Sequence, residues 1–388
     1  MSDSKLPSGW SPVKFGDVVR NVNETSRNLA ADGLDRVVGL DHLDPGSLRL
    51  MRWDSVADLP DGTTFTRKFK PGQVLFGKRR AYQRKVAVPH FSGVCSGDIL
   101  VFEPVDKRMT TEFLPYVVQS DGFFDHALGT SAGSLSPRTK WAELARYEFA
   151  LPPIDEQQKI VDLFVSIDES INNDREAARA ARESIRAVVT MSIQSAESAL
   201  HSLEDLFLVV GGATPSTGVA GNWDGDLLWA TPSDLSNCRD TTLVDTKRKI
   251  TQLGLDSCSA SLVPAGAILL STRATLGYPV IAGREMAFNQ GVTGLIPTEA
   301  ANAKFFVHLL SQMVPELSRI ASGSTFPEVP RSRLKKMKFR VPNREAQDLL
   351  VVNLDRLERL VRRLDDHERA TRDLRSVCLA LMAGTQVV

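Results

Sequence analysis

Apolar residues recur at alternating steps of four and three residues in two long stretches of the chain. The first stripe consists of Ile160, Phe164, Ile167, Ile171, Ala178, Ala181, Ile185 and Val188, and only Asp174 interrupts it. The second consists of Leu350, Leu354, Leu357, Leu360, Leu364, Leu374 and Leu381, with His367 and Thr371 as weaker positions. A period of 3.5 residues is typical of a coiled-coil seam, so the pattern predicts two long helices.

Each predicted helix has about 40 residues and is therefore roughly 60 Å long. Charged residues fill the other faces, and so narrow an apolar stripe does not stabilise a helix by itself in water. Each helix therefore needs a partner, and the other helix is the simplest one. We expect the packing residues to be Ile160, Phe164, Ile167, Ile171, Ile185, Leu350, Leu354, Leu357 and Leu364.

The first helix is preceded by the stretch "LPPIDEQQKIVDLF", which runs from Leu151 to Phe164. Proline is tolerated at the first turn of a helix, where its missing N–H has no intrahelical partner. Asp155 and Glu156 suit the positive end of the helix dipole. The stretch "VPNREAQDLLVVNL", from Val341 to Leu354, repeats this pattern of a proline followed by a helix start more loosely.

The rest of each half is of mixed character. Short β-like runs, "QVLFG", "DILVFEP", "GAILLST" and "GYPVIAG", are separated by glycine and proline. Shorter helical patterns cover 112–119 and 303–313. The pattern therefore predicts an α+β domain in each half, although it does not give the strand order of that domain.

The two halves form an internal repeat. A shift of 190 residues places 131–171 over 321–361, where roughly two or three identities are expected by chance. The identities are Gly133/Gly323, Ser134/Ser324, Pro137/Pro327, Leu144/Leu334, Phe149/Phe339, Pro152/Pro342, Gln157/Gln347 and Val161/Val351. Upstream, "GQVLFGKR" matches "GAILLSTR", which places Arg79 over Arg273. Coincidence would not maintain nearly the same offset over several separate blocks, so we infer a duplicated unit.

Composition narrows the class of protein. The 388 residues carry 47 basic and 47 acidic side chains, and no apolar run approaches the roughly 20 residues of a membrane span. The four cysteines lie apart, without CxxC spacing, and the N-terminus lacks the apolar core of a signal peptide. We therefore expect a cytoplasmic protein without structural zinc or any other metal site.

The sequence lacks the motifs of several enzyme classes. A DNA methyltransferase needs a glycine-rich cofactor loop and an Asn- or Asp-Pro-Pro-aromatic signature, and neither is present. No phosphate-binding GxxxxGK[ST] loop occurs either. We therefore expect a chain that binds rather than catalyses and holds no cofactor of its own.

Basic residues are unevenly distributed. Between Thr64 and Lys85 the chain carries eight basic residues, interleaved with aromatic rings, and no acid. Because Lys and Arg neutralise phosphates and Arg can read guanine edges, this stretch is a candidate DNA surface, although a solvated basic face is an alternative. The candidate residues are Arg67, Lys68, Lys70, Lys78, Arg79, Arg80, Arg84 and Lys85 in the first half, and Lys247, Arg248 and Arg273 in the second.

Two variable domains that alternate with two long helices resemble the specificity (S) subunit of type I restriction–modification systems. The matching residues are Leu151, Pro152, Pro153, Glu156 and Gln157, together with the preceding block "GTSAGSLSPRTKWAEL". The second boundary retains only Pro342 and Gln347 of this pattern. The resemblance covers essentially the whole chain, and its specificity lies in the order and duplication of short motifs.

The resemblance implies target-recognition domains at 1–152 and 200–342, and spacer helices at 153–199 and 343–384. Each domain would read one half of a bipartite DNA target. The helices would form an antiparallel coiled coil that sets the spacer and docks two modification subunits, with a pseudo-two-fold repeat overall. S-adenosylmethionine and ATP with Mg²⁺ would belong to the modification and restriction subunits.

An alternative is a coiled-coil scaffold that assembles a complex without reading DNA. An enzyme with an unrecognised site is a third possibility, which the absence of a catalytic constellation disfavours. The sequence does not give the target bases, the spacer length or the contacting side chains, and it does not say whether a restriction subunit accompanies the chain.

Overall fold

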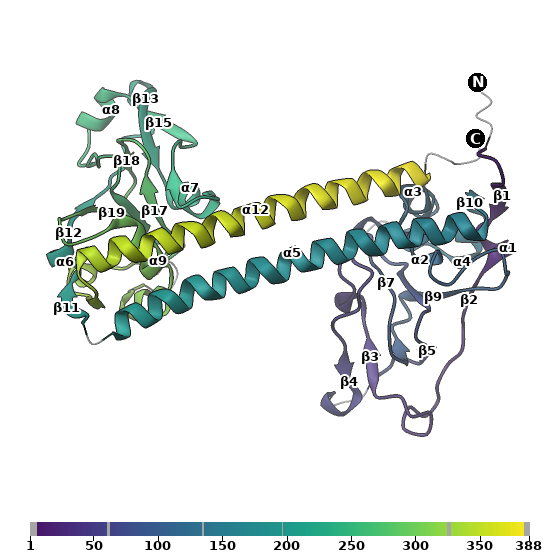
Figure 1. Cartoon of the computed structure of the whole chain (residues 1–388). Coiled ribbons are helices and arrows are strands. Elements are labelled where there is room, and N and C mark those ends of the chain that lie inside the picture. Colours follow the sequence, from purple (N-terminus) through teal and green to yellow (C-terminus); the bar gives the residue numbers. More distant parts are fainter. Residues whose placement is uncertain (1–5, 60–62, 134–135, 196, 324–326, 384–388) are drawn as a thin grey trace. The chain divides into compact units, whose positions relative to one another are not determined.

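The chain forms two compact units, each built from one mixed domain and half of each long helix (Figure 1). The structure, a computed structural model, describes residues 6–59, 63–133, 136–195, 197–323 and 327–383. Unit 1 combines residues 1–174 with 366–388, and unit 2 comprises residues 175–365. The repeat identity Ser134/Ser324 lies outside the described residues.

As in unit 2, the described residues of unit 1 form three sheets. Their strand orders are β2 (Val19–Asn21), β9 (Ile99–Pro104), β6 (Val74–Gly77), β7 (Val86–Ala87); β4 (Asp54–Ser55), β3 (Arg36–Val38), β8 (Gly93–Cys95), β5 (Arg67–Phe69); and β1 (Ser11–Lys14), β10 (Glu148–Leu151). The short helices are α1 (Phe15–Val18), α2 (Leu114–Gln119), α3 (Asp121–Gly129) and α4 (Trp141–Leu144), with 3₁₀ turns at Leu40–His42, Val56–Asp58 and Ala81–Gln83.

Unit 2 also contains three sheets. Their strand orders are β12 (Phe207–Gly211), β19 (Val292–Pro297), β16 (Ile268–Ser271), β17 (Pro279–Ala282), β14 (Thr242–Leu243); β15 (Arg248–Ile250), β13 (Trp223–Ala230), β18 (Ala287–Phe288); and β11 (Ala199–Ser202), β20 (Lys338–Val341). The short helices are α6 (Leu203–Leu206), α7 (Pro232–Asn237), α8 (Gln252–Asp256), α9 (Ala303–Ser311), α10 (Val314–Ile320) and α11 (Arg331–Lys335), with a 3₁₀ turn at Ala220–Asn222.

The same plan is present in both units. The order β2-β9-β6-β7 corresponds to β12-β19-β16-β17, and the antiparallel pair β1–β10 corresponds to β11–β20. The register agrees as well, because Ser11 faces Leu151 in the first pair and Ala199 faces Val341 in the second. The four β-like runs read from the sequence form β6, β9, β16 and β17, and the two shorter helical patterns contain α2 and α9. The α+β class and the duplication are therefore confirmed.

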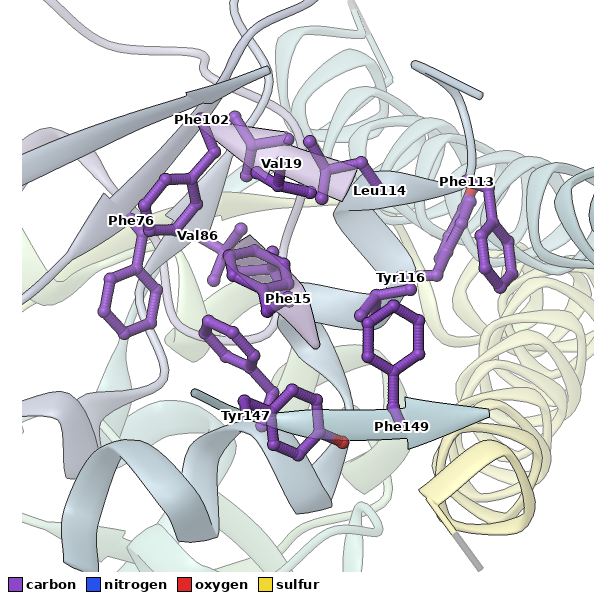
Figure 2. Close-up of a cluster of buried hydrophobic side chains, with 14 of the residues drawn as sticks. Phe15, Val19, Phe76, Val86, Phe102, Phe113, Leu114, Tyr116, Tyr147 and Phe149 are labelled. Carbon is purple, nitrogen blue, oxygen red and sulfur yellow. The ribbon is translucent and has the colours of Figure 1, made fainter. Parts of the chain in front are cut away.

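Aromatic side chains fill the core of unit 1 (Figure 2). Phe15, which follows β1, is fully buried and contacts the ring of Phe123 with centroids 4.8 Å apart and that of Phe102 at 5.5 Å. Tyr116 on α2 stacks on Phe164 of the first long helix at 4.6 Å. The domain and the helix therefore share one core. Unit 2 repeats this arrangement, since Leu354 of the second long helix lies in the cluster around Phe305 and Phe306.

The long helices are α5 (Ile154–Gln194) and α12 (Arg344–Ala383), and they pack against each other with opposite directions. In unit 1, Asp168 pairs with Arg375 and Asp174 pairs with His367, so the residue number on α12 falls as that on α5 rises. In unit 2, Arg182 binds Asp365 at 2.6 Å. The His367 Nδ1–Asp174 Oδ2 distance is 2.6 Å, so the two polar interruptions of the stripes meet each other.

Burial along α5 follows the predicted stripe. Phe164, Ile167, Ile171, Ala178 and Ala181 are buried, whereas Ile160 and Ile185 are half-buried. The helix ends at Gln194 and β11 begins at Ala199, so the expected helical segment 153–199 is too long at its C-terminal end.

The predicted stripe on α12 is wrong in part. Leu354 is buried and Leu350, Leu357 and Leu364 are half-buried, but Leu360, Leu374 and Leu381 are exposed. The buried face of the last turns instead passes through Arg375 and Leu379. The prediction followed the leucines, whereas the protein buries an arginine for which unit 1 supplies polar partners.

Candidate nucleic-acid interface

A buried glutamine fixes the start of each long helix to the domain before it. Gln157 accepts a hydrogen bond from Thr110 N–H at 3.0 Å and donates to the carbonyl of Pro152 at 2.8 Å. Gln347 accepts from Asn302 N–H at 2.8 Å and donates to the carbonyl of Pro342 at 2.9 Å. Both side chains are fully buried. The identity found in the repeat therefore has a structural cause, because one amide side chain satisfies loop and boundary groups that would otherwise be buried without partners.

The loop after β6 and its counterpart after β16 also share an unusual backbone. Arg80 has φ 54° and Ala274 has φ 63°, both in the left-handed region that few residues other than glycine adopt. Arg80 N–H donates to the carbonyl of Pro137 at 2.8 Å, and Ala274 N–H donates to that of Pro327 at 3.1 Å. These bonds hold each loop against the segment before the last strand of its domain.

Acidic residues from elsewhere in unit 1 reach the acid-free basic stretch. Lys68 lies 3.4 Å from Asp32, Lys70 lies 3.5 Å from Glu24, and Arg84 lies 2.6 Å from Asp121. The Arg84 guanidinium also lies over the Phe124 ring at 4.6 Å. These cations are therefore partly neutralised within the domain.

Asp98 is the centre of a second ionic cluster. Arg138 donates to its carboxylate at 2.8 Å, and Arg79 lies 3.5 Å away. The hydrogen bond from Arg138 is the main cause that holds the pKa of Asp98 below its usual range. Burial lowers the pKa of Lys78, which lies beside this cluster.

Two further residues of the stretch bond to the backbone. Arg67 donates to the carbonyl of Ile99 at 2.9 Å, and Lys85 donates to that of Leu40 at 2.6 Å. Arg80 and Tyr82 remain exposed, and the Tyr82 side chain is 57% accessible. Of the predicted set in unit 1, Arg80 is therefore the guanidinium most available to an external phosphate.

In unit 2 the predicted cations separate into different environments. Lys247 is exposed, and Arg273 pairs with Glu328 at 3.5 Å. The Arg248 guanidinium lies 3.5 Å from the centre of the Trp223 ring and 5.7 Å from that of Trp229. An arginine held against indole rings is restricted in its orientation, which suits stacking on a base or bidentate hydrogen bonding.

Unit 1 has an arginine–aromatic cluster that sequence reasoning missed. Arg36 lies over Trp53 at 4.8 Å and over Phe91 at 4.5 Å. Trp53 is 37% accessible, and Met51 beside it is 65% accessible. The cluster lies on the sheet with β3 and β8, a parallel pair that corresponds to β13 and β18 in unit 2. No local motif signals it, because its members lie far apart in the sequence.

The described residues also give information on metal binding, thiol reactivity and membrane insertion. Among them, no group of three His, Cys, Asp or Glu side chains could hold a metal ion. Burial raises the pKa of the Cys95 thiol to about 12, so this cysteine is protonated and unreactive. No helix in the described ranges is long and apolar enough to cross a membrane.

Comparisons with known proteins agree with the duplication. The family described as "Type I restriction modification DNA specificity domain" matches residues 7–178 and 197–370. The "Type I restriction enzyme MjaIX specificity subunit" of Methanocaldococcus jannaschii is 34% identical over 164 residues, which are 42% of this chain and 38% of that protein. The "Type I restriction enzyme EcoDI specificity subunit" of Escherichia coli is 25% identical over 176 residues, 43% of this chain and 38% of that protein.

A solved structure described as a type I restriction–modification system S subunit from M. genitalium has the same fold. It superposes with a TM-score of 0.59 at 11% identity, over 98% of this chain and 97% of that one. The two halves of the chain therefore match one domain family twice, and the whole chain matches one solved fold.

Proposed function

Because the chain belongs to the family of type I restriction–modification DNA specificity domains, we propose that it selects the DNA sequence on which a multisubunit complex acts. The observation that carries the proposal is the duplication of a complete unit within one chain. Both units share the order of four strands in one sheet, the same buried glutamine and an arginine–aromatic cluster on corresponding sheets. Two similar reading domains suit a DNA target made of two separate half-sites.

Within each half-site, phosphate contacts position the protein and base contacts specify the sequence. We assign phosphate contact to the predicted cations, first of all to the exposed Arg80 and Lys247. The ion-paired members of the set, such as Arg79 and Arg84, orient the loop that carries Arg80. The planar guanidiniums of Arg36 and Arg248, supported by tryptophan, are the candidates for base contact.

The two long helices would set the spacer between the half-sites. They contain 41 and 40 residues, so each is roughly 60 Å long. That length corresponds to somewhat under two turns of DNA at about 34 Å per turn. A change in helix length would then alter the number of base pairs between the half-sites without altering the half-sites themselves.

In this proposal the chain is a non-catalytic subunit. Its repeat offers two similar surfaces to two copies of a modification subunit, which would use S-adenosylmethionine to methylate adenine. Restriction subunits would use ATP and Mg²⁺.

The experiment is to sequence methylated adenines in cells that produce this chain with its modification subunits. We expect a bipartite motif, and removal of one heptad from both long helices should change only the spacer length. Arg179→Ala, which alters an exposed face of α5, is the matched control and should preserve the spacer. Methylation without a sequence motif would support a scaffold, and unchanged spacing after the deletion would refute the role of the helices.

A further inference from the structure

The repeat places different residues at one equivalent position of the helix pair. Unit 1 has an arginine there, and unit 2 has an isoleucine. The 190-residue repeat of the long helices places Glu358 over Asp168 and Arg375 over Ile185. On the neighbouring short helices, Gln157 and Gln347 bind the equivalent N–H groups of Thr110 and Asn302, which are 192 residues apart. The same offset places His308 over Tyr116.

In unit 1 an arginine satisfies the carboxylate at this position. Arg375 Nε donates to Asp168 Oδ1 at 2.7 Å, and its Nη2 donates to Gln119 Oε1 at 2.7 Å. The guanidinium also lies 5.7 Å from the centre of the Phe164 ring. Its side chain is only 10% exposed, so unit 1 holds a buried cation between its two helix halves and its domain.

In unit 2 the equivalent carboxylate has no such cation. Glu358 is 16% exposed, and among the described residues the only basic side chain that pairs with it is His308, whose Nε2 lies 3.5 Å from Oε1. Burial raises the pKa of Glu358 and lowers that of His308 to about 4, so the imidazole is neutral near pH 7. The nearby cations have other partners, since Lys304 binds Asp355 at 2.8 Å and Arg362 binds Asp240 at 2.7 Å.

A cavity with a volume of about 540 Å³ lies beside this carboxylate, within unit 2. Ile185, Leu276, Val280 and Val307 contribute apolar wall, and the titratable side chains in the lining include Glu358, His308, Asp240 and three arginines, Arg182, Arg239 and Arg362. Arg182 is paired with Asp365 and Arg362 with Asp240. The volume falls within the range of about 300–1,000 Å³ that is typical of small-molecule sites. A buried carboxylate without a cation, next to an apolar hollow, is chemically suited to a cation on an aliphatic stem.

We propose that this cavity of unit 2 binds a small organic cation, a guanidinium or primary ammonium group on a short aliphatic stem, with Glu358 as the anionic partner. The cation takes the place that the Arg375 guanidinium occupies in unit 1. The apolar wall receives the stem, and neutral His308 provides a ring nitrogen beside the charged group. The proposal is independent of DNA binding, because none of the predicted DNA-contacting residues Lys247, Arg248 and Arg273 lines the cavity.

The test is calorimetric titration of the full chain with n-butylguanidinium, with n-butylurea as the uncharged probe of the same shape. We expect saturable binding of the guanidinium and at least about tenfold weaker binding of the urea, since a hydrogen bond to a charged group is at stake. Glu358→Gln should weaken guanidinium binding by a similar factor. Asp373→Asn, an exposed acid on the same helix, should leave it unchanged.

Ile185→Arg provides a second, independent variant. It places in unit 2 the residue that unit 1 has at the equivalent position, so it should abolish binding of the probe and raise the melting temperature. Equal binding of the urea, or unchanged binding by Glu358→Gln, would overturn the proposal. If addition of the modification subunits abolished binding of the probe, the proposal of a free small-molecule ligand would be overturned. The cavity would then receive a side chain of a modification subunit.

Discussion

The two units share their backbone and amide contacts but differ in their charged contacts. Gln157 and Gln347 form the same kinds of hydrogen bond to equivalent groups. By contrast, Arg79 in unit 1 pairs with Asp98, whereas the equivalent Arg273 in unit 2 pairs with Glu328, which stands where unit 1 has Arg138. A carboxylate on either side of the arginine gives the same neutralisation. Such ion pairs are interchangeable in a way that a buried amide in a narrow site is not.

The strongest test of this comparison is the removal of both glutamines in turn. Gln157→Ala leaves Thr110 N–H and two carbonyls, those of Pro152 and Arg108, without their partner. Each buried polar group so stranded costs about 1–3 kcal/mol, so for the three groups together we expect a loss of at least about 3 kcal/mol. Urea unfolding followed by circular dichroism measures it.

Gln347→Ala should have an effect of similar size, because its bonds to Asn302, Ala300 and Pro342 are equivalent. Gln158→Ala, which removes only an exposed bond to Asp162, is the control and should change stability by less than about 0.5 kcal/mol. A large difference between the two buried sites would show that the units are not equivalent at their helix boundaries.

The next test converts the cation site of unit 1 into that of unit 2. Arg375→Ile leaves Asp168 without its ion pair and removes the hydrogen bond to Gln119. Because the Asp168 side chain is 34% exposed, water replaces part of the lost interaction, and we expect a loss of about 2–3 kcal/mol rather than the full cost of a stranded buried charge. In a unit of this size this corresponds to a fall of about 4–12 °C in the melting temperature of unit 1.

Arg369→Ile is the matched control, because Arg369 is an exposed residue of the same helix that pairs with Asp366 three residues away. It should shift the melting temperature by no more than about 2 °C. If Arg375→Ile behaved like this control, the buried ion pair of unit 1 would have no role in holding the helix to the domain.

The features that could be predicted from the sequence are those that local periodicity and the repeat encode. The buried arginine was missed because its partners are distant in the chain. The 3.5-residue stripe located both helices, and the repeat located the buried glutamines. The stripe was misplaced after Leu364 because hydrophobicity favours Leu374 over Arg375 as a buried residue. The partners that make burial of Arg375 possible, Asp168 and Gln119, lie 207 and 256 residues away in the chain.

The candidate DNA surface shows the same limit. The run without acids predicts a basic surface patch. In the folded chain, Asp32, Asp98 and Asp121, which lie outside the run, form ion pairs with its basic residues. The Arg36–Trp53 contact joins a residue of β3 to one that precedes β4, and neither residue stands in a recognisable motif. Charge patches and stacked clusters depend on tertiary contacts, which periodicity does not report.

The smallest expected effect is a difference between the two units in how their stability depends on pH. His308 in unit 2 corresponds to Tyr116 in unit 1, whose pKa burial raises to about 12, so unit 1 has no titration at this position between pH 5 and 8. Burial lowers the pKa of His308 from 6.5 to about 4, so the unfolded chain binds a proton in this window and the folded chain does not. Stability therefore falls as pH falls from 6.5 towards 4, by about 2 kcal/mol between pH 6.5 and 5 at 1.36 kcal/mol per pH unit.

Glu358 acts in the opposite direction, because its raised pKa makes the folded state more stable as the carboxyl becomes protonated. The prediction is therefore tested on the difference between variants, with urea midpoints measured from pH 7.5 to 5. Relative to His308→Gln, the wild-type chain should lose about 2 kcal/mol across pH 6.5 to 5. Glu358→Gln should steepen the wild-type loss, since it removes the opposing titration and leaves that of His308. Parallel pH profiles for the wild type and His308→Gln would mean that His308 has the same pKa in the folded and unfolded states. His308 and Tyr116 would then differ only in the shape of their side chains.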